Sequence, residues 1–93
     1  GDLMELTPDY DARKSFYGKA IINVDRSGAY AATLTSYGTP VARVEWDENT
    51  LNYSLVLLKD WDCSATTLRH VKEFLKQHAF KADTKKQMQR DYS

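Results

Sequence analysis

The sequence predicts an α+β domain in which a four-stranded antiparallel sheet is followed by one long helix. Residues 64–79, SATTLRHVKEFLKQHA, carry apolar side chains at the spacing of one helix face. Residues 19–58 contain four short segments with β-forming residues and alternating apolar positions, separated by turn sequences. A chain of 93 residues has room for a single domain with one modest core.

Residues 1–18 show no clear helix or strand period. Pro8 removes a backbone donor and disfavours a helix in the residue before it. We expect an ordered N-terminal arm whose aromatic side chains, Tyr10, Phe16 and Tyr17, pack in the core, because each buried ring contributes about 2–3 kcal/mol.

The four strands are expected to form hairpins. They cover residues 19–25, 29–37, 41–46 and 51–58. The sequences between them, DRSG, GTP and DENT, are short and rich in turn-forming residues. Short connections favour antiparallel neighbours, so the sheet, residues 19–58, is predicted to be a meander.

The helix over residues 64–79 is predicted to lie across one face of this sheet. Its apolar stripe consists of Leu68, Val71, Leu75 and His78, with Phe74 beside it. Ser64 or a threonine after it is placed to cap the helix. The outer face is expected to hold Arg69, Lys72, Glu73, Lys76 and Gln77, with Arg69 and Glu73 paired at i, i+4.

A short last helix is expected near residues 84–91. Thr84 and Gln87 have the spacing of a capping box, and Met88 is the apolar anchor of this segment.

The second face of the sheet would carry Ile21, Thr33, Tyr37, Val56 and Leu58. A large bare apolar face is unusual in a monomer. We expect the N-terminal arm to cover it, with a homodimer as the second solution and a partner protein as the third.

Composition excludes a strong global attraction to nucleic acid or anionic lipid, because the formal net charge is zero. Cys63 is the only cysteine, so no internal disulfide forms, and a lone thiol suits the reducing cytoplasm. The longest apolar run, residues 55–58, is far shorter than a membrane helix. We therefore expect a cytoplasmic protein that does not contact the membrane.

No metal site or cofactor is predicted. His70 and His78 are two helical turns apart, and His78 on the apolar stripe is interpreted as a hydrogen-bonded core residue. For catalysis, the candidates are Asp60, Asp62 and Cys63, which precede the main helix. Acidic residues and a bystander cysteine at a helix start are the plainer interpretation, so we expect no catalytic residues.

The candidate binding residues form a basic ridge and two aromatic positions. The ridge consists of Arg69, Lys72, Lys76, Lys85 and Lys86, and the aromatic residues are Tyr37 and Trp61. Such a surface suits nucleic acid or an acidic protein surface. A solvated helix face is the simplest explanation of the ridge.

Three segments resemble a known family. They are LTPDYDARKSFYGKA (6–20), SYGTPVA (36–42) and SATTLRHVKEFLKQHAF (64–80), and together they cover most of the chain. The family consists of small domains of unknown function from bacteriophages, plasmids and other mobile elements of Firmicutes and gut bacteria. The resemblance does not point to any particular catalytic or binding residues. It implies an accessory role, such as binding a host or phage protein.

The sequence therefore favours a non-enzymatic binding domain of mobile-element origin that contacts another protein, such as a host defence or replication component. The alternative is an accessory protein that binds nucleic acid through the basic ridge. A small enzyme using Asp60, Asp62 or Cys63 is the third hypothesis.

Overall fold

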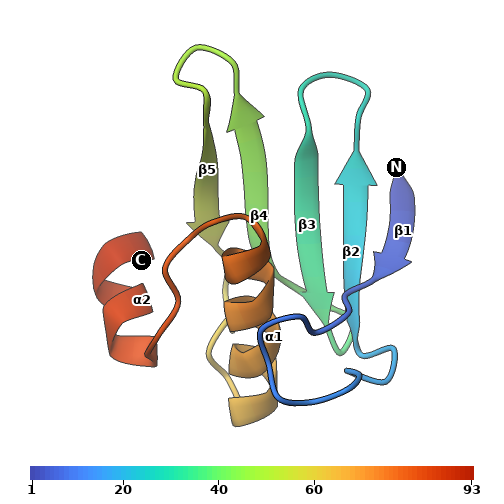
Figure 1. Cartoon of the computed structure of the whole chain (residues 1–93), viewed down its shortest axis with the longest axis vertical. Coiled ribbons are helices and arrows are strands. Elements are labelled where there is room, and N and C mark those ends of the chain that lie inside the picture. The colour runs from blue at the N-terminus through green and yellow to red at the C-terminus, as the bar shows by residue number, and fades with distance from the viewer.

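The strands follow one another in the sheet in chain order. The computed structural model describes residues 1–93, and its five antiparallel strands lie in the order β1-β2-β3-β4-β5 (Figure 1). They are β1 (Asp2–Glu5), β2 (Ala20–Asp25), β3 (Ala31–Ser36), β4 (Thr39–Asp47) and β5 (Asn52–Leu57). Two helices follow, α1 (Ala65–Gln77) and α2 (Lys85–Tyr92). The predicted α+β class with an antiparallel meander is confirmed.

The sheet has one strand more than predicted. Residues 2–5 of the expected arm form β1, which pairs with β2 so that Leu3 lies opposite Asn23 and Met4 opposite Ile22. All four residues of β1 are exposed, and Leu3 retains 72% of its accessible surface. An edge strand without a buried side has no alternation of apolar residues, which is why the sequence did not predict it.

The core lies between α1 and one face of the sheet. In Figure 1, α1 lies in front of the lower part of the sheet, roughly along the direction of the strands, and α2 lies beside it, near β5. Val71, Phe74 and Leu75 of α1 are fully buried. The facing strand residues alternate along β2, β3 and β4, and the buried ones include Ala20, Ile22, Val24, Ala32, Leu34, Ala42 and Val44.

Hydrogen bonds fix both ends of α1. The Ser64 hydroxyl accepts from the Thr67 N–H at 3.1 Å, so Ser64 is the N-cap. At the other end, the His78 Nδ1–H donates to the Phe74 carbonyl at 2.8 Å. The His78 Nε2 can then accept from the Tyr30 hydroxyl at 3.1 Å. Burial raises the pKa of Tyr30, which keeps its proton available. His78 is hydrogen-bonded as predicted, but it is half-buried and lies at the edge of the core rather than within it.

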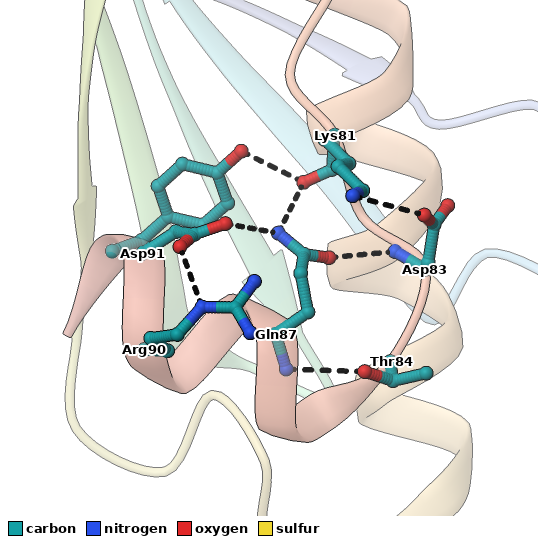
Figure 2. Close-up of polar contacts among 7 residues, drawn as sticks. Lys81, Asp83, Thr84, Gln87, Arg90 and Asp91 are labelled. Carbon is teal, nitrogen blue, oxygen red and sulfur yellow. Dashed lines mark hydrogen bonds and ion pairs between the residues drawn. The ribbon is translucent and has the colours of Figure 1, made fainter.

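The predicted short helix forms as α2 and is tied down by Gln87 (Figure 2). The Thr84 hydroxyl accepts from the Gln87 N–H at 3.0 Å. The Gln87 side chain accepts from the Asp83 N–H and donates to the Lys81 carbonyl and to Asp91. In the usual capping box this side chain would accept from the N–H of the N-cap residue, Thr84. Here it accepts from the N–H of the preceding residue, Asp83. Met88 is fully buried, as expected.

The second face of the sheet is open, and the expectation that the N-terminal arm covers it is wrong. Residues 6–19, the β1–β2 loop, pass instead to the helix side of the sheet (Figure 1). The open face is largely polar. Arg43 donates to Thr33 at 2.8 Å and to Glu45 at 2.9 Å, while Val56 is 54% exposed. An antiparallel sheet with one polar face tolerates water there, so no cover is required.

Neither helix combines the length and the apolar character that crossing a membrane requires.

Replacement of Phe74 by alanine should lower the free energy of unfolding by about 3–5 kcal/mol, because it removes a fully buried ring from the centre of the core. Urea denaturation followed by circular dichroism measures this change. Val56→Ala, on the open face, is the control and should change stability by less than about 0.5 kcal/mol. Equal effects of the two variants would contradict the placement of the core.

Candidate functional site

A buried carboxylate attaches the β1–β2 loop to α1. Glu73 is 1% exposed. Its two oxygens accept from three consecutive backbone N–H groups, those of Asp9, Tyr10 and Asp11, at 3.0, 2.9 and 2.9 Å. The Gln77 side-chain amide donates to the same carboxylate at 2.7 Å. A buried charge is tolerable when it is fully hydrogen-bonded, and bonds to an ionised acceptor are the stronger kind.

The expected Arg69–Glu73 pair does not form, and Glu73 does not lie on the outer face. Arg69 donates instead to Asp11 at 2.9 Å. Glu73 is three residues after His70, which is itself buried, so it borders the packed side of the helix. This spacing is the only sign of its burial in the sequence, because the backbone N–H groups that it binds are more than 60 positions away.

The loop and α1 enclose a groove of about 310 Å³, which we call the loop–helix groove. It is lined by Tyr10, Asp11, Ala12, Arg69, Lys72, Glu73 and Lys76. Lys72 and Lys76 are half-buried and have no carboxylate within 4.0 Å. Three of the five predicted ridge residues therefore lie together in one hollow.

The other two ridge residues do not line this groove. Lys85 is on α2 and lies 3.5 Å from Asp62, and Lys86 is exposed. With Arg69 bound to Asp11, two of the five predicted cations are engaged by carboxylates of the chain. The predicted ridge is therefore divided between two helices rather than concentrated in one stripe.

Two turns at one end of the sheet contain the same dipeptide, Tyr-Gly, and we call them the tyrosine turns. Tyr17 and Gly18 have φ of 55° and 72°, and Tyr37 and Gly38 have φ of 50° and 80°. Positive φ at both central residues is the pattern of a type I′ turn. The turns are adjacent, since the Tyr37 N–H donates to the Lys19 carbonyl at 2.9 Å.

Both tyrosines are exposed. Tyr17 retains 76% of its accessible surface and Tyr37 retains 57%. Tyr37 thus has the exposure expected of a binding residue. The prediction that Tyr10 and Tyr17 are core residues is wrong, whereas Phe16 is 4% exposed and belongs to the core as expected. Tyr10 and Tyr17 are exposed because the β1–β2 loop is attached through its backbone, which leaves these rings directed to solvent.

A buried polar cluster lies beneath Tyr37. The His70 Nδ1 and the Ser36 hydroxyl are 2.7 Å apart, and Ser36 is 3.1 Å from the Thr67 hydroxyl. The Phe16 ring meets the His70 ring edge-on at 4.6 Å, and the Tyr37 ring lies at 5.7 Å. Burial lowers the pKa of His70 below its usual 6.5, and the positive charge of Arg13 lowers it further, opposed by Asp11.

Trp61 does not fit the predicted aromatic contact role. It is 7% exposed and forms part of the hydrophobic core. The sequence placed it in a polar loop before the helix, but the loop packs inward at this residue because an indole ring buries a large apolar surface.

The proposed catalytic candidates do not line a hollow. The structure has three hollows, and none is lined by Asp60, Asp62 or Cys63. Cys63 is exposed, and Asp62 pairs with Lys85. Ser36 and His70 form the only close pair of hydroxyl and imidazole that is fully buried, at 3% and 1% exposure. They too border no hollow. No group of three or more His, Cys, Asp or Glu is arranged to hold a metal ion.

Glu73→Gln should lower the free energy of unfolding by about 1–3 kcal/mol, because it replaces an ionised acceptor of four hydrogen bonds with a neutral amide. The amides of residues 9–11 should also lose protection in hydrogen exchange measured by NMR. Glu48→Gln, at an exposed position, is the control and should change neither property. Unchanged protection of residues 9–11 would contradict the role of Glu73.

Stability should fall as the pH is lowered from 6.5. Because the folded protein binds a proton at His70 less readily than the unfolded chain, the unfolded chain holds more protons below pH 6.5, the usual pKa of histidine. The contribution of neutral His70 to the free energy of unfolding is therefore fully present above this pH. It is lost progressively as the pH falls below it. Urea denaturation at several pH values measures the slope. His70→Asn removes the titrating imidazole, so the free energy of unfolding should depend less on pH in this variant. An unchanged pH dependence would show that another group is responsible.

The model of a family of unknown function, DUF8033, matches residues 4–90. No curated protein and no solved structure gives a match. The family match spans β1 to α2 and includes the β1–β2 loop, both tyrosine turns and the loop–helix groove. The chain therefore belongs to the DUF8033 family of proteins of unknown function.

Proposed function

We propose that the chain is a non-enzymatic binding domain that acts by contact with another protein. The tyrosine turns are the observation that carries this proposal. Tyr17 and Tyr37 hold left-handed backbone conformations and are both more than half exposed. They are the residues that we assign to the contact.

The fold gains little from tyrosine at these positions. A non-glycine residue with positive φ costs about 1–2 kcal/mol, and type I′ turns prefer Asn-Gly or Asp-Gly. An exposed ring returns little of this cost through burial. Strained residues without a packing benefit are most often found where a ligand or partner binds. Leu51 is also strained and exposed but stands alone in its turn, whereas Tyr17 and Tyr37 lie in adjacent turns. It is this pairing of two exposed aromatic residues that supports a functional contact.

The surroundings suit a protein partner. Tyrosine and arginine are enriched among the residues that carry the binding energy of protein interfaces. Lys14 and Lys19 are exposed in the same loop, and Arg13 lies close enough to His70 to affect its pKa. The Glu5 carboxylate accepts from the Gly18 N–H at 2.9 Å, so one anion and three cations belong to this region. The remaining positive charge favours an acidic partner surface.

The class of partner rests on the resemblance to domains from mobile elements. We propose the same origin for this chain, and a component of host defence or replication as the partner. The cytoplasm is the corresponding compartment. A homodimer is the second solution for the contact, and the oligomeric state measured by light scattering distinguishes the two.

Nucleic acid is the alternative ligand. Binding of nucleic acid is favoured by one observation: Tyr10, Lys72 and Lys76 line the same groove, the loop–helix groove. Exposed aromatic rings next to cations bind single strands by stacking and charge. Such binding would weaken steeply with salt.

The proposal is tested with Tyr37→Asn. Asparagine is preferred in a type I′ turn, so this variant should raise the free energy of unfolding by about 1 kcal/mol. The tagged wild-type chain should capture a protein from nuclease-treated host lysate, and the more stable variant should not. A loss of binding together with a gain in stability cannot arise from misfolding.

Leu51→Asn is the matched control. Leu51 also has a positive φ, 56°, and is exposed, but it lies in the turn between β4 and β5 at the opposite end of the sheet (Figure 1). This variant should be stabilised in the same way and should keep the partner. Capture that survives Tyr37→Asn would refute the assigned surface, and capture that disappears with nuclease would favour nucleic acid.

A further inference from the structure

The loop–helix groove combines a rigid wall with unpaired positive charge. Its loop wall is held by the hydrogen bonds from residues 9–11 to Glu73. Its helix wall presents Lys72 and Lys76, half-buried and without a carboxylate within 4.0 Å. A groove that is already formed requires little ordering when a ligand binds.

The two lysines occupy an unfavourable arrangement in the free protein. They are four residues apart on one helix, where like charges face each other and destabilise the helix. Arg69 is next to them but is bound to Asp11. An anionic group placed between Lys72 and Lys76 would remove their repulsion, so the groove is complementary to a carboxylate or phosphate.

The charge and size of the groove favour an acidic side chain over a nucleic acid strand. The groove is lined by three cations, Arg69, Lys72 and Lys76, and by two carboxylates, Asp11 and Glu73, so its net charge is only +1. A nucleic acid strand needs a longer positive track that follows several phosphates. A volume of about 310 Å³ is at the lower limit for ligand pockets and suits one or two side chains.

We propose that the loop–helix groove binds an acidic segment of the partner protein, with glutamate or aspartate carboxylates between Lys72 and Lys76. This inference rests on the proposed function as a protein-binding domain and adds the chemistry of the partner. Tyr10, exposed at the groove, packs against the aliphatic part of the bound acidic side chain. The partner thus meets aromatic rings at the tyrosine turns and cations in the groove.

The test compares two fluorescein-labelled probes, a hexaglutamate peptide and a hexathymidylate oligonucleotide. Fluorescence anisotropy at low salt measures the affinity of each. The peptide should bind more tightly than the oligonucleotide, and in NMR spectra it should shift the amide signals of residues 10–12 and 69–76. Lys72→Ala with Lys76→Ala should weaken peptide binding about tenfold.

Lys85→Ala with Lys86→Ala is the matched control. It removes the same number of charges from α2, outside the groove, and should leave peptide binding within about twofold of wild type. The inference is overturned if the control weakens binding as much as the groove variant. It is also overturned if the oligonucleotide binds more tightly, or if millimolar peptide shifts no groove amide.

The outcome separates this inference from the proposed function. Tyr37→Asn does not change the groove, so it should leave hexaglutamate binding unaltered. If the groove fails its test while Tyr37→Asn still abolishes capture, the domain binds protein but its partner is not recognised through an acidic segment. If the groove passes while capture survives Tyr37→Asn, the acidic segment is recognised without the tyrosine turns.

Discussion

The hydrogen bonds of the Glu73 carboxylate determine where the candidate contact surfaces lie. They attach the β1–β2 loop to α1 through three backbone N–H groups, independently of the loop side chains. The loop can then expose Tyr10 and Tyr17 while Phe16 inserts into the core. Because it is attached through its backbone, the loop forms a fixed wall of the groove. A buried charge that loses its partners is costly, so detaching the loop from Glu73 would be unfavourable.

Stability and exposure are in conflict at the tyrosine turns. Each turn would be less strained with asparagine in place of tyrosine, and both tyrosines remain more than half exposed. Beneath Tyr37, the side chains of Ser36, Thr67 and His70 form a hydrogen-bonded cluster, and no buried polar side-chain atom lacks a partner. The supporting layer is therefore well ordered while the layer above it is strained. That combination would hold the two tyrosines in place before the proposed partner binds.

The two faces of the sheet have different roles. The helix side holds the core, the groove and the loop, whereas the open face is crossed by hydrogen bonds between Arg43, Thr33 and Glu45. These bonds satisfy the polar groups of neighbouring strands without help from another molecule. The open face therefore does not require a second copy of the chain, and the contact surfaces that we assign are all outside it.

Local patterns in the sequence determined the helices and the hairpins. The period of residues 64–79, the cap at Ser64 and the Thr84–Gln87 spacing predicted α1 and α2, because each depends on residues within a few positions. Only the tertiary structure decided that Glu73 is buried, that residues 2–5 form a strand, and that Tyr10 and Tyr17 are exposed while Trp61 is not. These outcomes depend on contacts between segments that are distant in the sequence. A local pattern does not indicate which distant segment will pack against a given side chain.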